Sequence, residues 1–349
     1  MRIPTFVVLL ILLGSCGPSS TRVKEKTCSG CRDAEQFCLT GNEAAACGLT
    51  GVSCVACGSG QACEQGTCVA GSGGGAGGGT GTGGGPGISP DGGLDDCSAE
   101  AKLVYVVDQN RTLSSFNPRL IGTTNGPFVE LGQIACPSQP AAEPFSMAVD
   151  RNATAWIIYD SGELFTVDVK VQPLVCVKTG FVPQQTVAKF GMGFVANMAG
   201  SKEETLFISG SATGSSLNTT KFGKLNTVAP YTLTVLGMLN GAPELTGTGD
   251  AKLWAFLPNV TPPKVARLSK ASGAIESVFE VPGLAGVPRA WAFAFWGGNF
   301  FIFLQRATDN STVVWKMNAA TGALSSVVAD TGRTIVGAGV STCAPVEIN

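Results

Sequence analysis

Five short apolar runs recur along residues 97–349, and their spacing constrains the fold of this region more than any other feature. The runs are rich in β-branched and aromatic residues and are bounded by turn-forming residues, as β-strands require. They lie at Leu103–Val107, Ala155–Tyr159, Thr205–Ser209, Lys252–Phe256 and Phe300–Leu304. No stretch of this region has the 3.6-residue apolar period of a helix. We therefore predict an all-β domain over residues 97–349.

A second marker follows each run, where a strand ends on an apolar residue and then Asn, Asp or Ser. These dipeptides are spaced by 51, 58, 43 and 49 residues and lie at Phe116-Asn117, Val167-Asp168, Leu225-Asn226, Leu268-Ser269 and Met317-Asn318. A spacing of about fifty residues is typical of four-stranded propeller blades with variable loops. A β-sandwich would not explain a spacing sustained over five repeats. The prediction is a single β-propeller, with five blades preferred and six as the alternative.

The two ends of this region complete one another. Ile335–Val340 resembles an innermost blade strand, such as Trp291–Phe295 or Phe190–Phe194, but no partner strands follow it. The first run, Leu103–Val107, has no innermost strand before it. Pairing the last strand with the first completes a fifth blade and removes the exposed sheet edges.

Four cysteines lie in the same region. Cys97 and Cys343 would be neighbours in the closed ring, so we expect a disulfide bond there that locks it. Cys136 and Cys176 each follow an outer strand in successive blades and are expected to pair with each other. In the chain-entropy description, a bond that closes so large a loop as Cys97–Cys343 contributes roughly 5 kcal/mol.

The N-terminus carries a bacterial export signal. Arg2 is followed by the apolar run Phe6–Leu13 and by Leu13-Gly14-Ser15-Cys16, which matches the lipobox of lipoprotein signal peptidase. We predict a signal peptide over 1–15, a lipid on Cys16 that attaches the chain to the membrane, and a leader over 16–27. The apolar run is too short for a mature membrane span, which needs about 20 residues.

A cysteine-rich module is predicted over residues 28–70. Its two half-repeats share the frame Cys-x2-Cys, Gln-x-Cys-x2-Gly and a closing cysteine, formed by Cys28, Cys31, Cys38 and Cys47 and then by Cys54, Cys57, Cys63 and Cys68. An exported chain meets an oxidising environment, so eight cysteines are expected to form four disulfides. A tetrathiolate zinc ribbon is the alternative, because two Cys-x2-Cys pairs suit such a site.

A glycine-rich segment separates this module from the propeller. Gly71–Gly93 contains 14 glycines in 23 residues, so it cannot bury enough apolar surface to offset its ordering entropy. Residues 71–96 are therefore expected to be a disordered linker.

Composition narrows the functional classes. The chain contains no histidine, which removes the commonest general base and the commonest transition-metal ligand. The net charge is −2 and the sequence has no basic stripe, so it lacks the positive surface that nucleic-acid binding requires. No complete catalytic motif is present, so we predict a protein that is not an enzyme and has no cofactor.

Two further patterns have both a structural and a functional interpretation. Asp108-x-Asn110-x-Thr112 and Asp150-x-Asn152-x-Thr154 could supply oxygen ligands to calcium, but Asx chemistry in turns explains them without a metal. Trp296 and Asn299 flank a glycine pair at a hairpin tip, where an exposed aromatic ring could contact a ligand. The inner-strand residues Met147, Met192 and Phe293 are expected to line or plug the channel.

The layout resembles Cys-rich, Gly-linker-tethered surface lipoproteins of myxobacteria and their relatives. The likeness rests on Leu13–Cys16, Cys28–Cys68, Gly71–Gly93 and the blade start Phe145–Asp150. It implies an outer-membrane or cell-surface location, and Gly17 fits this because it is not the aspartate typical of inner-membrane retention.

Three functional hypotheses remain open at this point. The first is a lipid-anchored propeller that binds a protein or carbohydrate partner through its loops, without catalysis. The second is a propeller hydrolase or lyase that uses carboxylates and calcium, which requires an acid pair facing the central channel. The third is a structural component of the envelope.

Overall fold

The computed structural model describes residues 28, 31–32, 38–39, 42–43, 46–47, 52–55, 61–64, 67–70, 97–212 and 218–347. The chain forms two compact units, Met1–Asp95 and Asp96–Asn349, and each is described by itself. Cys16, the predicted signal peptide and the predicted linker lie outside the described residues, so they stay predictions.

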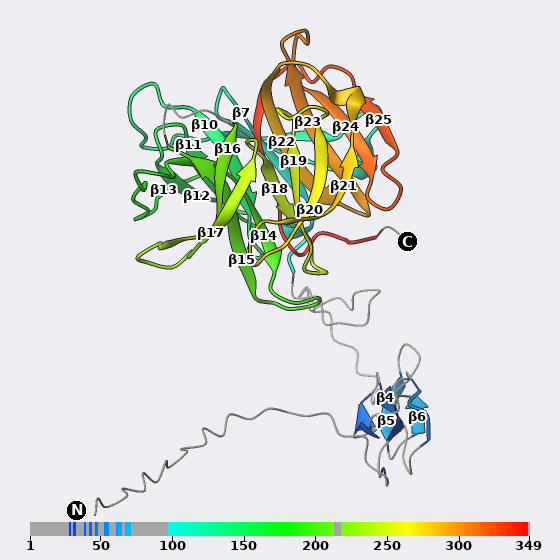
Figure 1. Cartoon of the computed structure of the whole chain (residues 1–349). Helices are drawn as coiled ribbons and strands as arrows, with labels where there is room; N and C mark the ends of the chain where they lie inside the picture. The colour runs from blue at the N-terminus through cyan, green and yellow to red at the C-terminus, as the bar shows by residue number, and fades with distance from the viewer. Residues whose placement is uncertain are drawn as a thin grey trace, which may run out of the picture. The chain divides into compact units, whose positions relative to one another are not determined.

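The second unit is a five-bladed β-propeller (Figure 1). Each blade is a four-stranded antiparallel sheet, and four blades take their strands in chain order. These are β10 (Pro144–Val149), β11 (Thr154–Tyr159), β12 (Leu164–Asp168) and β13 (Cys176–Lys178); β14 (Lys189–Ala196), β15 (Glu204–Ser211), β16 (Thr219–Leu225) and β17 (Leu233–Asn240); β18 (Glu244–Gly247), β19 (Leu253–Leu257), β20 (Lys264–Leu268) and β21 (Ile275–Glu280); and β22 (Pro288–Trp296), β23 (Asn299–Arg306), β24 (Val313–Asn318) and β25 (Leu324–Val328).

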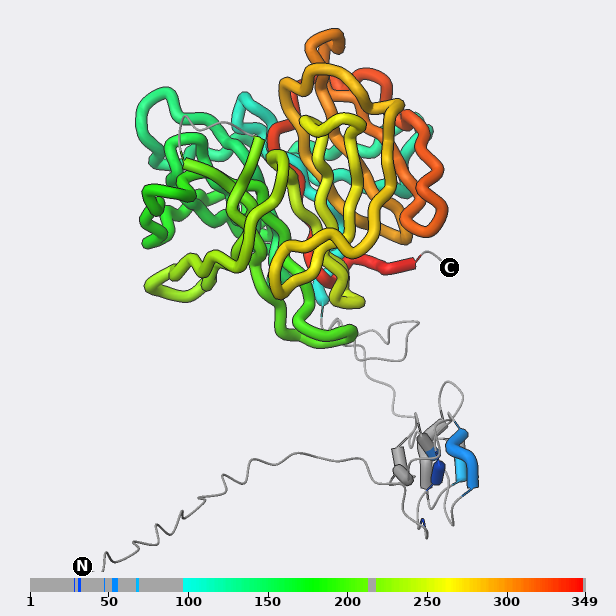
Figure 2. The backbone as a smooth tube through the Cα atoms, in the orientation of Figure 1, coloured from blue at the N-terminus to red at the C-terminus, as the bar shows by residue number. Residues whose placement is uncertain are grey.

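The remaining blade joins the two ends of the propeller. Its order is β26 (Ile335–Val340), β7 (Val104–Asp108), β8 (Thr112–Phe116) and β9 (Phe128–Gln133). The last strand pairs antiparallel with the first, with Val340 opposite Val104. Figure 2 shows this pairing where the red end of the chain meets the cyan start of the propeller. The predicted ring closure and the count of five blades are confirmed, and the alternative of six is wrong.

The sequence repeats correspond to fixed positions in the blades. The five apolar runs form the second strands β7, β11, β15, β19 and β23. The five marker dipeptides fall at the ends of the third strands β8, β12, β16, β20 and β24. Both strands lie in the middle of a blade; the second is largely buried and the third partly buried, so both carry a readable apolar pattern.

Apolar side chains fill the spaces between neighbouring blades. Met147 belongs to such a cluster with β7 and β11 residues, Met192 to one with Trp156 and Ile208, and Phe293 to one with Trp254 and Phe300. Their side chains are fully buried. The expectation that they line or plug the channel is therefore wrong, because an innermost strand turns its side chains toward the two adjacent blades.

The inner strands pack closely around the axis, and glycines permit this approach. A Cβ atom on Gly247 of β18 would lie 2.1 Å from the carbonyl oxygen of Phe194 in β14. One on Gly339 of β26 would lie 2.8 Å from the carbonyl carbon of Ala148 in β10. The axis is therefore packed by backbone contacts along much of its length.

The two disulfides expected in the propeller are formed. Cys97 bonds to Cys343 across 246 residues, and Cys136 bonds to Cys176 across 40 residues. One detail differs from the expectation, since Cys136 follows an outer strand but Cys176 begins the next one, β13. The second bond therefore ties two neighbouring blades at their outer strands.

Helical structure in the described residues is limited to short 3-10 turns at Glu100–Lys102, Pro118–Leu120 and Pro282–Leu284. No helix in the described part of the chain has the length and apolar character needed to cross a membrane.

The first unit contains paired strand segments. These are β1 (Cys31–Arg32) with β2 (Cys38–Leu39), β3 (Asn42–Glu43) with β4 (Ala46–Cys47), and β5 (Gln61–Glu64) with β6 (Thr67–Ala70). Cys31 forms a disulfide with Cys54, which joins the two predicted half-repeats. This bond consumes one thiol from each Cys-x2-Cys pair, so the zinc-ribbon alternative is wrong.

The other cysteines of this unit are described in part. Cys28, Cys47 and Cys68 are also disulfide-bonded. The side chains of Cys38, Cys57 and Cys63 lie outside the description, so their bonds stay predictions.

Candidate functional site

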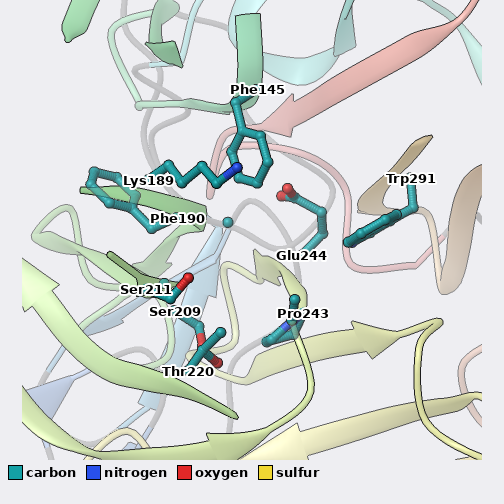
Figure 3. A pocket seen from close by; sticks show the side chains of 12 residues that line it. Phe145, Lys189, Phe190, Ser209, Ser211, Thr220, Pro243, Glu244 and Trp291 are labelled. Atoms are coloured by element: carbon teal, nitrogen blue, oxygen red, sulfur yellow. The ribbon is translucent and has the colours of Figure 1, made fainter. Parts of the chain in front are cut away.

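Four inner strands begin at the same end of the propeller axis and place polar and aromatic side chains together there. The side chains are Phe145 from β10, Lys189 from β14, Glu244 from β18 and Trp291 from β22, and they line one hollow (Figure 3). We call this hollow the axial mouth. Its volume of about 10 Å³ is room for about one water-sized group.

Glu244 is the acid of the axial mouth, and it is 3% exposed. Its Oε2 accepts a hydrogen bond of 2.8 Å from the Ser146 hydroxyl, and the Met192 backbone N–H donates to the same carboxyl. The bond from Ser146 crosses the axis from β10 to β18, two strands that belong to non-adjacent blades. Burial raises the pKa of Glu244 well above its ordinary value, although both hydrogen bonds oppose the rise.

No described basic group accompanies this carboxyl, since the groups that shift its pKa include no cation. Lys189, the basic residue of the axial mouth, instead holds its Nζ over the ring of Phe145, 5.0 Å from the centroid. An ammonium in that position is attracted by the negative face of the ring. The mouth therefore contains a buried acid and a nearby ammonium that do not pair.

The remaining polar side chains of the wall are satisfied. The Ser209 and Thr220 hydroxyls lie 2.7 Å apart in a hydrogen bond, and Thr220 also donates to the Gly241 carbonyl. Both side chains are buried. They stabilise the wall and leave Glu244 as the buried acid of the axial mouth with no cation among the groups that shift its pKa.

A second polar cluster lies where the inner strands end. Glu204 at the start of β15 accepts from the Arg151 backbone N–H and from the Thr342 hydroxyl, both at 2.8 Å. Burial raises the pKa of Glu204 to about 7, the two hydrogen bonds lower it, and the Asp150 carboxylate raises it. Arg151 also donates from Nη2 to the Cys97 sulfur at 3.3 Å, so the cluster adjoins the Cys97–Cys343 bond.

Glu204 also borders a wider hollow of about 370 Å³ on the blade β14–β17. Its lining is mostly polar and includes Thr205, Lys224, Asn226, Thr227, Thr232 and Thr234. Hollows of this volume accommodate small ligands.

The two turn motifs are structural. Asp108 accepts from the Thr112 N–H at 2.9 Å, which is the Asx interaction predicted from the sequence. Asp150 accepts from the N–H groups of Asn152 and Thr154 through Oδ1, and from the Trp156 indole through Oδ2. Within the described residues no group of three or more acidic or cysteine side chains is placed to hold a metal ion.

The acid pair required by the hydrolase hypothesis is not found among the described lining residues. Glu244 is the one carboxyl of the axial mouth. At the other end of the axis, Glu204 and Asp150 are near neighbours, but their oxygens accept structural hydrogen bonds.

The surface ligand site predicted at the hairpin tip is wrong. Trp296 is 3% exposed, its indole N–H donates to the Lys102 carbonyl at 2.7 Å, and its ring packs in the cluster with Phe301. The Asn299 amide donates to the Gly297 carbonyl at 2.8 Å. The hairpin also contacts the C-terminal segment, where the Gly297 N–H donates to the Pro345 carbonyl.

Glu244 was missed in the sequence because the inner strand β18 is only four residues long. An acid at the start of an inner strand, where other blades have Pro144 or Ile335, is the signal that could have identified it.

Comparison with known proteins finds only distant similarities. No protein-family model matches the sequence, and no curated protein matches it. A functionally unknown protein from Desulfotomaculum acetoxidans is 14% identical with a TM-score of 0.37, over 72% of this chain and 74% of that one. TolB from Acinetobacter baumannii is 11% identical with a TM-score of 0.37, over 68% and 55%.

A sugar dehydrogenase is also similar. The PQQ-bound aldose sugar dehydrogenase from Streptomyces coelicolor is 11% identical with a TM-score of 0.42, over 74% of this chain and 84% of that one. At such identities and scores these similarities carry no argument about activity.

Proposed function

We propose that this chain is a lipoprotein of the cell envelope, attached at the outer membrane or cell surface through a lipid on Cys16. Its propeller binds a protein or carbohydrate partner and does no chemistry on it. The predicted lipobox and the predicted glycine linker support this placement, because a tethered head can search for a partner away from its anchor.

The observation that carries the binding function is Glu244. A carboxyl that is ionised while buried without a cationic partner destabilises a fold, and the hydrogen bonds from Ser146 and Met192 offset that cost only in part. Local features that cost stability are concentrated at functional sites. Glu244 lies at the axial mouth, where a bound ligand would offset the cost of burying this carboxyl.

The composition supports a role without catalysis. The chain has no histidine, and the axial mouth offers one carboxyl where acid–base hydrolysis of glycosides uses two. The wider hollow on blade β14–β17 adds hydroxyl and amide groups suited to hydrogen bonding with a polar partner.

The test is a binding experiment with the full mature chain. A glycan array and a cross-linking pull-down from envelope extract are run in parallel. Heat-denatured protein is the control that shows whether binding requires the folded chain. We expect a saturable ligand in one of the two, competed by excess unlabelled chain. Failure of both to yield such a ligand would overturn the binding function.

A structural role in the envelope is the second candidate. The closed ring and the two propeller disulfides favour it, because both make a rigid head. Deletion that causes envelope defects, with no ligand in either binding experiment, would favour this candidate over the first.

A further inference from the structure

We propose that the axial mouth binds the ammonium group of its ligand, with Glu244 as the counter-ion and Phe145 and Trp291 as aromatic walls. The ligand class is a primary or alkylated amine, such as a lysine side chain of a partner. This inference rests on the proposed binding function and names the group that the propeller recognises.

The first observation is that an ammonium of the chain itself already lies in this mouth. Lys189 Nζ stands 5.0 Å from the centroid of the Phe145 ring. Figure 3 shows it next to that ring, with the Glu244 carboxyl on the side toward Trp291. The ring face therefore accommodates a cation, and Lys189 is an internal competitor for the same surface.

The second observation is the state of Glu244. Its carboxyl lies in the lining of the hollow and has hydrogen bonds from Ser146 and Met192 but no described cationic partner. The attraction between this carboxylate and a single ammonium beside it would be stronger in the low dielectric of the interior than at the surface. An ammonium head is about the size of a water molecule, which is the size that the hollow holds.

The lining favours an organic ammonium over a metal ion. Calcium takes about six to eight oxygen ligands. The mouth supplies one carboxyl, and the hydroxyls of Ser146, Ser209 and Thr220 are already engaged in hydrogen bonds. Aromatic faces instead suit alkylated ammonium groups, whose methylene or methyl groups pack on the rings.

The proposal carries a pH dependence. Burial favours the protonated form of Glu244, whereas an ammonium binds the ionised form, so binding releases a proton. The charged group that faces Glu244 from a neighbouring strand is Lys189 of β14, and the lining residues from β10 and β22 are the uncharged Phe145 and Trp291. The affinity for the ammonium ligand should rise by up to about tenfold per pH unit, up to the pH at which Glu244 is already ionised in the ligand-free chain.

The test is calorimetric titration of the full chain with Nα-acetyl-lysine methylamide. The neutral isostere Nα-acetyl-norleucine methylamide is titrated in parallel, both at pH 6, 7 and 8. We expect the lysine probe to bind about tenfold or more tightly than the norleucine probe, and more tightly at higher pH. These comparisons use the unaltered chain, so they do not depend on any variant folding.

Variants then assign the site. Glu244→Gln should weaken the lysine probe by about tenfold or more and remove the pH dependence. Lys189→Met removes the internal competitor and should leave the affinity equal or higher. Glu280→Gln, on the exposed outer strand β21 of the same blade and in neither hollow, is the matched control and should leave the affinity unchanged.

Equal binding of the two probes, no binding of the lysine probe, or full affinity in Glu244→Gln would each overturn the proposal. A partner captured in the pull-down or on the glycan array, but not displaced by the lysine probe, would reject this site while leaving the binding function in place.

Discussion

At the scale of single residues, Glu204 shows how a buried carboxyl links pH to stability. Burial raises the pKa of Glu204 to about 7 in the folded chain, against about 4.3 for an unfolded glutamate. The folded state therefore holds the proton more tightly between these values. The contribution of this group is favourable below the unfolded pKa and is lost as pH rises through 7, by at most about 4 kcal/mol.

We predict that Glu204→Gln flattens this dependence. The amide oxygen can still accept from Arg151 or Thr342, but it carries no charge to bury. Urea unfolding at pH 5 and pH 8 should show a smaller loss of stability in the variant than in the unaltered chain. An identical loss in both would reject the role given to Glu204.

Two residues mark the limit of what the sequence predicts at this scale. The sequence predicts Trp296 at an exposed hairpin tip, but its indole bonds to Lys102 and packs in an apolar cluster with strands of the neighbouring blade, so it is buried. Glu244 was not singled out, because its importance depends on Ser146, 98 residues earlier in the chain. The burial of Trp296 and the environment of Glu244 both depend on contacts between blades. Local sequence patterns do not reveal such contacts.

At the scale of strands, predictability follows burial. The second strand of each blade is buried on both faces, so its apolar run is visible in the sequence, as in β11 (Thr154–Tyr159). The outermost strands are exposed, as in β9 (Phe128–Gln133) and β21 (Ile275–Glu280). A strand that faces solvent needs no apolar alternation, so β9 and β13 gave no signal of their own.

The packing of the inner strands gives a prediction at this scale. Gly339→Ala in β26 places a Cβ against the backbone of β10 and should lower the free energy of unfolding by about 1–3 kcal/mol. Gly283→Ala is the matched control, because its nearest neighbour is the Leu324 side chain at 3.7 Å. Its effect should stay within about 0.5 kcal/mol.

Chemical denaturation of both variants measures the difference. Equal effects of the two substitutions would show that the inner strands do not approach one another as closely as described.

At the scale of the whole propeller, ring closure was the most predictable feature. In the sequence, the last strand lacks partners and the first blade lacks an innermost strand, so pairing the two is predicted. The structure confirms this, because β26 pairs with β7. The Cys97–Cys343 bond followed from that closure. The contact of Arg151 with the Cys97 sulfur could not be predicted, because Arg151 follows β10 in the neighbouring blade.

The two propeller disulfides should contribute unequally to stability. The chain-entropy description gives about 5 kcal/mol for Cys97–Cys343, which spans 246 residues, and about 4 kcal/mol for Cys136–Cys176, which spans 40. We predict that the double substitution Cys97→Ser with Cys343→Ser lowers the unfolding midpoint more than Cys136→Ser with Cys176→Ser. The reverse order would contradict the idea that the first bond locks the ring.

The proposed function depends most on the lipid at Cys16, because the binding head acts at the envelope only if it is held there. Mass spectrometry of the protein extracted from native membranes tests this directly. We predict an N-terminal peptide that begins at Cys16 and carries the mass of a diacylglyceryl group, and its absence from a Cys16→Ala variant. An unmodified Cys16 in a chain recovered from the soluble fraction would contradict it.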